Sequence, residues 1–288
     1  MANPPFSVSE CTTFPATFEQ DVAGYAAGGA QGIGIWEFKL QPGRDAQNVA
    51  LMRENNLRAT VCVPDVPSIY PEGYFTKPVE PRERTRLLCD AIRRFALFDP
   101  VGILVVQGDP AGQDLAEMRR GTVRGLREVA AVAADLGMKI GVEFYRQTSG
   151  SMLNTIVDTA GLIDEIGAPN VGMILDLWHA YPLPNLLEDV RTYATKFLAV
   201  QVNDVREPTR SWADRLFPGE GVMDLPAILG ALEAGGYDGW YDMEIFSDDG
   251  RFGNAFPDSI APMDPAEVTR RGLRGFLKAW EARGVGVA

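Results

Sequence analysis

The sequence predicts a (β/α)8 barrel that occupies residues 1–288 as a single domain. Short β-branched or apolar runs alternate with longer stretches of helical periodicity along the whole chain. The repeating unit averages about 35 residues, which is typical of one strand followed by one helix. Because no Ser-, Gly- or Pro-rich linker divides the 288 residues into halves, one closed barrel is favoured over two domains.

Eight runs of strand character are each followed by a stretch of helical periodicity. The expected strands are Ser7–Thr12, Gly32–Phe38, Arg58–Val63, Gly102–Gln107, Lys139–Phe144, Val171–Leu175, Phe197–Val202 and Trp240–Ile245. The expected helices are Thr17–Ala27, Ala46–Asn55, Pro81–Ala96, Leu115–Leu136, Met152–Ile166, Leu186–Ala194, Leu225–Ala234 and Pro265–Ala282. This alternation predicts parallel strands surrounded by helices.

Residues at the predicted helix starts agree with this arrangement. Asp114, Asn185 and Asp224 stand where a side-chain oxygen can accept from the free amides of a first turn. An open, doubly wound sheet is the alternative, and it requires a glycine-rich phosphate turn after the first strand. The segment Ser9–Thr13 contains no glycine, so the closed barrel is favoured.

Composition excludes several classes of protein. The net charge is -12, which is the wrong sign for a surface that follows nucleic-acid phosphates. Apolar runs such as Val101–Val106 are too short to cross a membrane. The first residues lack a secretory signal, so we expect a cytoplasmic protein. The three cysteines form no CxxC pair, which argues against a thiolate zinc site.

Four polar residues lie near the carboxyl ends of consecutive predicted strands, where barrel enzymes place their chemistry. They are Glu143, Asp176, Gln201 and Glu244. Three converging carboxylates repel one another in a low-dielectric pocket unless a positive charge lies among them. A divalent cation would supply that charge, and the oxygen ligands favour Mn²⁺ or Mg²⁺ over zinc, with Co²⁺ possible. The alternative is that each residue pairs with a nearby Arg or Lys.

Other residues near the same rim are candidates for catalysis or substrate binding. His179, the single histidine of the chain, follows Asp176 by three residues, and a position just past a barrel strand suits a catalytic group. Trp36 and Trp178 could stack on a sugar ring, although barrel mouths also bury tryptophan to exclude water.

Arg215 lies on the loop predicted to follow the seventh strand. A guanidinium at this place could hold a hydroxyl, carboxylate or phosphate group of a substrate. A salt bridge to Asp214 or Glu220 is an equally plausible role for Arg215.

Several of these segments together carry a family resemblance. They are Gly-Val-Glu-Phe at 141–144, Asp-Leu-Trp-His at 176–179, Arg-Leu-Phe-Pro-Gly-Glu-Gly at 215–221 and Glu-Ile-Phe at 244–246. The chain resembles the sugar phosphate isomerase/epimerase superfamily of xylose isomerase-like barrels. It is similar in particular to ketose 3-epimerases, inosose isomerases and inosose dehydratases, from Ser7 to about Phe252.

The resemblance implies one divalent metal held by Glu143, Asp176, the seventh-strand residue and Glu244, with a keto-sugar or keto-polyol as substrate. The commonest pattern has histidine on the seventh strand, whereas this chain has Gln201. Either its amide oxygen replaces the imidazole or the metal site is lost, and we expect replacement because a lost site would not need to keep the other three carboxylates. The expected reaction is isomerisation or epimerisation, in which Glu143 and Glu244 carry protons, His179 contacts a substrate oxygen and Arg215 holds the distal part of the substrate.

Three other functions are weighed against this hypothesis. A lyase or dehydratase performing β-elimination on a keto-sugar, inosose or keto-glycoside would use the same metal site and residues, with His179 assisting the leaving group. Metal-dependent DNA repair on this fold needs several histidines, and one histidine with a charge of -12 does not fit it. A sugar-binding barrel without chemistry is the third alternative. A homo-oligomer is possible, because barrels of this kind often associate.

Overall fold

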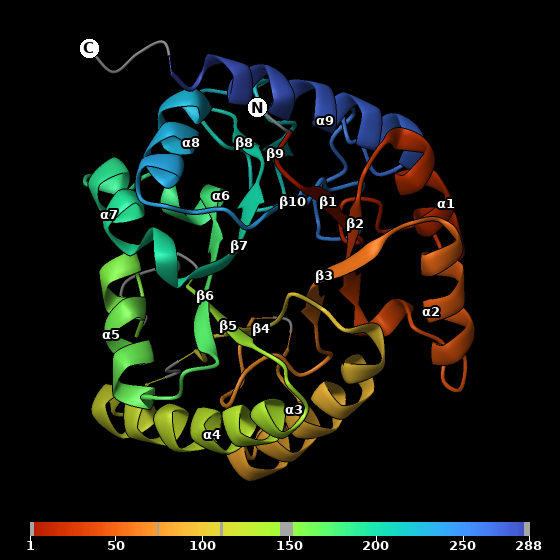
Figure 1. The fold of residues 1–288 in the computed structure, drawn as a ribbon. Coiled ribbons are helices and arrows are strands. Elements are labelled where there is room, and N and C mark those ends of the chain that lie inside the picture. The colour runs from red at the N-terminus through yellow and green to blue at the C-terminus, as the bar shows by residue number, and fades with distance from the viewer. Residues whose placement is uncertain (1–2, 74, 110–111, 145–151, 285–288) are drawn as a thin grey trace.

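A computed structural model describes residues 3–73, 75–109, 112–144 and 152–284. Parallel strands in this part of the chain close into a barrel in the order β1-β10-β7-β6-β5-β4-β3-β2 (Figure 1). The strands are β1 (Phe6–Ser9), β2 (Gly32–Trp36), β3 (Arg58–Val63), β4 (Gly102–Val106), β5 (Ile140–Glu143), β6 (Val171–Asp176), β7 (Phe197–Val202) and β10 (Trp240–Met243). The predicted barrel is therefore confirmed.

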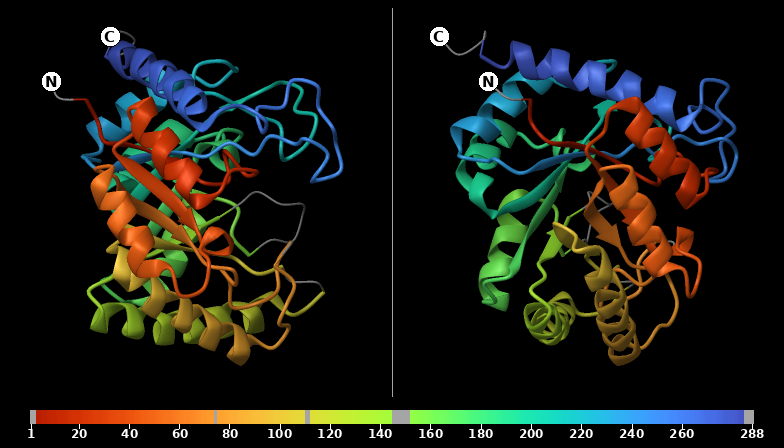
Figure 2. Two further views of the ribbon diagram at one scale, coloured as in Figure 1. Left: turned by 90° about the vertical axis from the view of Figure 1, so that its right-hand side faces the viewer. Right: turned by 45° about the vertical axis from the view of Figure 1, so that its right-hand side comes forward.

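Helices surround this barrel as an outer ring (Figure 1). They are α1 (Phe18–Gly28), α2 (Asp45–Glu54), α3 (Pro81–Phe95), α4 (Leu115–Asp135), α5 (Ile156–Ile166), α7 (Leu186–Tyr193), α8 (Leu225–Ala234) and α9 (Pro265–Ala282). Helix α9 packs against α1, so that the two ends of the chain close the ring. Figure 2 shows that the longest loops extend from one end of the barrel.

The structure differs from the sequence prediction at several places. The fifth helix begins at Ile156 rather than Met152, because the Thr155 side chain accepts a hydrogen bond from the Asp158 amide and caps the helix there. A short helix, α6 (Leu177–Ala180), directly follows β6. Two short antiparallel strands outside the barrel, β8 (Asp204–Val205) and β9 (Arg215–Leu216), were not predicted.

Asp114 and Asp224 cap α4 and α8 as predicted, each accepting a backbone hydrogen bond three residues ahead. The expectation for Asn185 is wrong, because its side chain makes no capping hydrogen bond to α7. Acidic residues in the first turn, Glu188 and Asp189, complement the helix dipole there instead.

Apolar packing fills both sides of the barrel wall. The larger core lies between the strands and the surrounding helices. A smaller cluster includes inward-facing side chains of the barrel, among them Val61, Leu104, Ile174 and Ala199. Because side chains alternate along a strand, the residues two positions beyond Ile174 and Ala199, Asp176 and Gln201, share the inward face. The core thus gives way to polar side chains near the carboxyl ends of the strands.

No helix within the described ranges combines the length and apolar character needed to span a membrane.

Candidate functional site

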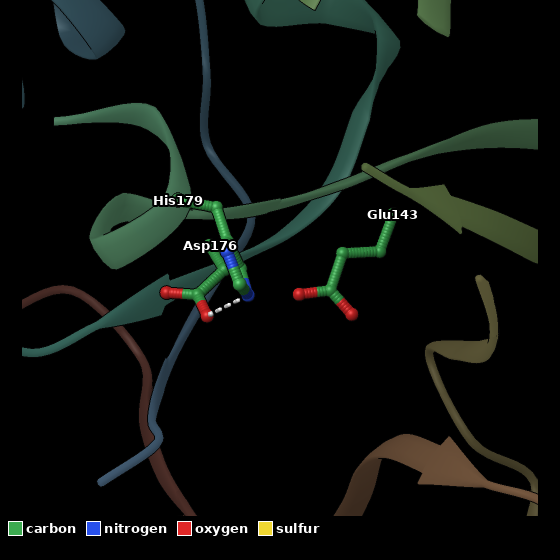
Figure 3. A group of neighbouring side chains, drawn as sticks. All are labelled: Glu143, Asp176 and His179. Atoms are coloured by element: carbon green, nitrogen blue, oxygen red, sulfur yellow. Dashed lines mark ion pairs between the residues drawn. The ribbon is translucent and has the colours of Figure 1, made fainter. Parts of the chain in front are cut away.

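Three side chains converge at the carboxyl end of the barrel (Figure 3). Glu143 is the last residue of β5, Asp176 the last of β6, and His179 lies on α6 immediately beyond. One potential metal-ligating atom from each residue lies within 4.8 Å of the others. His179 Nε2 is 3.6 Å from Asp176 Oδ2. The parallel ladder between β5 and β6 pairs Val142 with Met173, so the two carboxylates lie at the same end of the barrel.

Arg215 lies between carboxylates that come from the two strands on either side of β7. Its Nη1 is 2.8 Å from Asp176 Oδ2 and 3.1 Å from Glu244 Oε2. Glu244 directly follows β10, and all three side chains are at most 4% exposed. We call Glu143, Asp176, His179, Arg215 and Glu244 the charged cluster.

The salt bridges considered for Arg215 from the sequence are not formed. Asp214 binds Arg206 and Arg210, whereas Glu220 binds Arg271. The alternative in which strand-end carboxylates pair with a basic residue therefore holds for Asp176 and Glu244, and the basic residue is Arg215.

The β8–β9 pairing brings Arg215 to this position. Asp204, fully buried on β8, organises the loop that runs between Leu216 and Leu225. Its carboxylate accepts hydrogen bonds from the backbone N–H groups of Val205, Gly219 and Met223. Gly221 packs closely here, since a Cβ atom would lie 2.3 Å from the carbonyl oxygen of Val205. These local contacts place the Arg215 guanidinium beside Asp176 and Glu244.

Burial dominates the electrostatics of the charged cluster. It raises the pKa of Glu143 well above the ordinary value, and the nearby charges of Glu244 and Asp176 raise it further. Burial likewise raises the pKa of Glu244 to about 8, although Arg215 opposes this. Burial lowers the pKa of His179 to about 3, so its imidazole is neutral near pH 7. Burial lowers the pKa of the Arg215 guanidinium, but the nearby carboxylates of Asp176 and Glu244 outweigh this effect, so that the pKa is raised.

Gln201 lies on β7 in register with Asp176 on one side and Asp242 on the other. It is fully buried, and neither Oε1 nor Nε2 has a hydrogen-bond partner. Asp242 lies one layer deeper than Glu244 and accepts hydrogen bonds from Ser7 and Thr60. Burial raises the pKa of Asp242 to about 7. A buried amide without partners is costly, so Gln201 is a candidate ligand-binding group.

A cavity of about 610 Å³ opens above the charged cluster. Trp36 and Trp178, predicted to line the rim, both contribute to its wall. Glu143, His179, Arg215 and Glu244 also face it, whereas Gln201 and Asp176 are not among its lining residues. The remaining lining residues are Phe14, Phe38, Val63, Pro67, Glu72, Gly73, Phe75, Leu104, Val106, Trp212, Phe246 and Phe252.

Two polar residues that support the cluster were not predicted from the sequence. Asn203 donates hydrogen bonds from Nδ2 to Asp176 Oδ1 at 2.8 Å and to the carbonyl oxygen of Glu244 at 3.1 Å. Ser9 lies 3.4 Å from Glu244 Oε1 and accepts a hydrogen bond from Trp36 Nε1. A signal was available for Asn203, because it lies two residues beyond Gln201 and thus on the same face of the chain.

Sequence comparisons give relatives with isomerase and dehydratase names. Over 135 residues the chain is 25% identical to the inosose isomerase of Halalkalibacterium halodurans, which is 46% of this chain and 48% of that protein. Over 174 residues it is 32% identical to the 3-dehydroshikimate dehydratase of Pseudomonas putida, which covers 55% of this chain and 26% of that protein. The chain thus spans about half the length, or less, of these curated relatives.

Comparison of structures supports the fold. The crystal structure of the IOLI protein, which binds a zinc atom, has a TM-score of 0.79 and 17% sequence identity, with 96% of this chain and 97% of that chain covered. The family described as Xylose isomerase-like TIM barrel matches residues 25–280. With the closed parallel barrel and the carboxylates at its strand ends, this match shows that the chain belongs to the Xylose isomerase-like TIM barrel family.

Proposed function

We propose that this protein is a divalent-metal-dependent isomerase or epimerase that acts on a keto-sugar or keto-polyol. The reaction would begin with removal of a proton from the carbon next to the carbonyl group. The observation that carries the proposal is the charged cluster, in which two glutamates with raised pKa values face the same cavity as a buried arginine and a neutral histidine.

The residues present fit a divalent ion. Glu143, Asp176 and His179 already offer closely spaced ligand atoms. Asp176 Oδ2 lies beside Arg215 but receives no hydrogen bond of acceptable geometry, and Gln201 Oε1 receives none either. Buried oxygens without hydrogen-bond donors are suited to a cation. The set proposed from the sequence, Glu143, Asp176, Gln201 and Glu244, therefore remains our proposal, and His179 is a further candidate ligand.

Three carboxylates against one guanidinium leave the charged cluster short of positive charge. A divalent ion would complete the balance, and it would polarise the substrate carbonyl and acidify the adjacent C–H bond. We propose Mn²⁺ for the oxygen-rich set, with Mg²⁺ or Co²⁺ as substitutes. The bound zinc of the IOLI protein supports a divalent ion on this fold without favouring one metal.

Glu143 and Glu244 are the proposed proton carriers. They come from β5 and from the end of β10, so they approach the cavity from different strands. The raised pKa of each carboxyl group makes it a stronger base than an ordinary glutamate and allows it to hold a proton near neutral pH. Removal of a proton by one and return by the other inverts a centre, whereas return to the adjacent carbon isomerises the substrate.

Arg215 and His179 would orient the substrate. The guanidinium is held between Asp176 and Glu244 and still lines the cavity, so its remaining N–H groups can donate to a substrate oxygen. The imidazole of His179 is neutral and can accept or donate one hydrogen bond. Trp178 and Trp36 bound the space in which the substrate would lie.

A lyase or dehydratase is the second candidate. It is favoured by the similarity to a 3-dehydroshikimate dehydratase, which at 32% has the higher identity of the two relatives described above. The same initial proton removal next to a carbonyl leads to elimination when a substituent stands on the β carbon. His179 would then contact the departing oxygen.

The proposal is tested by incubating the protein with Mn²⁺ and a panel of keto-sugars and inososes in D₂O. We expect deuterium next to the carbonyl in a turned-over substrate, detected by NMR. The same spectra separate an epimer or isomer from a dehydrated or cleaved product. Metal analysis of protein purified without chelator should give close to one divalent ion per chain. A lack of both exchange and bound metal, even after Mn²⁺ is added, would support a barrel without chemistry.

A further inference from the structure

We propose that the substrate carries an aromatic group in addition to its keto-polyol portion, and that the outer cavity binds this group. The keto-polyol portion rests on the proposed function, whereas the binding of an aromatic group does not. The inference comes from the six aromatic side chains that line one continuous part of the cavity. We call this set the aromatic wall, and it consists of Phe14, Trp36, Phe38, Trp212, Phe246 and Phe252.

The rings of the aromatic wall contact one another across segments that are distant in sequence. The ring centroids of Phe14 and Phe38 are 5.0 Å apart and stacked, and those of Phe14 and Phe252 are 5.8 Å apart and edge-on. Trp212 lies 4.8 Å from Phe252 and 5.2 Å from Phe246. These separations are those of favourable aromatic pairs. The rings therefore pack against one another as one surface.

The other cavity walls outside the charged cluster are also mainly apolar. Val63, Pro67, Phe75, Leu104 and Val106 line it, all from or after strands β3 and β4. Among the described lining residues, carboxylate, imidazole and guanidinium groups come from the charged cluster and Glu72 alone. Hydroxyl groups of a sugar placed against the aromatic wall would lose water without gaining partners, which costs free energy. An aromatic ring in this place avoids that cost and gains from burial.

The aromatic wall is held in place by polar contacts behind it. Asp248 is fully buried and accepts hydrogen bonds from the backbone N–H groups of Gly250, Phe252 and Asn254. The guanidinium of Arg251 lies 4.4 Å from the centroid of the Phe14 ring. Such contacts keep the rings in position before a ligand arrives, which reduces the entropy lost on binding.

Exposure and size also agree with a binding surface rather than a closed core. Phe38 is 46% exposed, although an aromatic side chain of this size is normally buried. The cavity volume of about 610 Å³ falls within the range of roughly 300 to 1,000 Å³ that is usual for drug-sized ligands. A monosaccharide at the charged cluster would leave the aromatic wall in contact with water, so a larger ligand is favoured.

The test compares two stable ligands that differ in one group. Phenyl β-D-glucopyranoside and methyl β-D-glucopyranoside are titrated into the full chain, and binding is followed by tryptophan fluorescence, since Trp36, Trp178 and Trp212 line the cavity. We expect the phenyl glycoside to bind at least about tenfold more tightly, because it buries a ring that the methyl glycoside lacks. Equal affinities, or no detectable binding of the phenyl glycoside, would overturn the proposal.

Variants locate the preference. Phe38→Ala is expected to remove most of the phenyl preference without changing the methyl affinity. The control is Leu187→Ala, which truncates a side chain of similar exposure, 47%, on α7, and it should keep the full preference. Loss of the preference in the control variant, or its persistence in Phe38→Ala and in a second variant, Phe252→Ala, would contradict the assignment.

Glu143→Gln separates this proposal from the proposed function. This variant should lose exchange in D₂O and retain the preference for the phenyl glycoside. If the wild-type protein shows the phenyl preference but exchanges no keto-sugar, the proposed function fails while the aromatic wall stands. If the wild-type protein exchanges a keto-sugar but does not prefer the phenyl glycoside, the proposal for the aromatic wall fails while the proposed function stands.

Discussion

The charged cluster and the aromatic wall face one cavity but are built on different parts of the barrel. Glu143 and Asp176 end strands of the closed sheet, and Glu244 directly follows one. Phe14 and Phe252, by contrast, lie on loops whose shape depends on side-chain contacts. The hydrogen-bonded ladder fixes the carboxylates of the charged cluster and also Trp36, whereas segments beyond the barrel strands carry the other five rings of the aromatic wall. This division lets a barrel keep one chemistry while its loops change the substrate.

The two regions also differ in how their side chains contribute to the stability of the fold. The charged cluster holds four charged side chains of at most 6% exposure, and its stability depends on mutual compensation. The aromatic wall is more exposed, since Trp36 alone of its six rings is buried and Phe38 is 46% exposed. Substitutions in the cluster should therefore affect both reaction and folding, and those in the wall should affect recognition.

Glu143→Gln should have the largest effect. We expect deuterium exchange to fall by about 10²- to 10⁴-fold, because that is the usual contribution of a positioned proton carrier. The free energy of unfolding should be unchanged or higher, since the variant removes a carboxylate whose pKa is raised by burial. Exchange kinetics in D₂O and urea unfolding measure the two quantities. Wild-type exchange in the variant would exclude Glu143 as a base.

Arg215→Met should lower the free energy of unfolding by roughly 3 to 5 kcal/mol, because it leaves Asp176 and Glu244 buried without their counter-charge. Arg251→Met provides the matched control beside the aromatic wall, because the Arg251 guanidinium lies against the Phe14 ring. Arg251 pairs with Asp249 at a partly exposed site, so its loss should cost under about 1 kcal/mol. If urea unfolding shows that Arg215→Met and Arg251→Met destabilise the protein equally, the expected difference in stability between the two regions is wrong.

Asp248→Asn should have a smaller, pH-dependent effect. Burial alone would raise the pKa of Asp248, but backbone hydrogen bonds from Phe252, Asn254 and Gly250 outweigh it and lower the pKa. The ionised Asp248 carboxylate therefore stabilises the folded protein fully above the pKa of about 3.9 that an aspartate has in the unfolded chain. This stabilisation is lost as the pH falls through the lower pKa of Asp248 in the folded protein. We expect the variant to be about 1 kcal/mol less stable at pH 7.

Unfolding of wild type and Asp248→Asn at pH 7 and near pH 3 checks this expectation. The difference between them should narrow at low pH, because the wild-type carboxylate becomes protonated. A difference that stays constant over this range would mean that the charge of Asp248 does not stabilise the loop beneath the aromatic wall.

Sequence periodicity was sufficient for the barrel and for most of the charged cluster. Strand and helix order depends on local alternation of apolar residues, and local signals such as Asp114 and Asp224 as caps were also readable. The hairpin of β8 and β9 was not predicted, because each strand has two residues and periodicity needs more. Asn185 fails as a cap for a different reason: the residue type favours capping, but the surrounding backbone decides whether the side chain accepts the hydrogen bond.

The amino-acid sequence by itself determined the barrel and placed Glu143, Asp176 and Glu244 near the carboxyl ends of its strands, since both depend on spacing along the chain. Tertiary structure decided that Arg215 pairs with Asp176 and Glu244 rather than with its sequence neighbours, and that six aromatic rings form one wall. These contacts join residues far apart in sequence across loops. Their geometry depends on how the closed barrel brings those loops together, which no local pattern encodes.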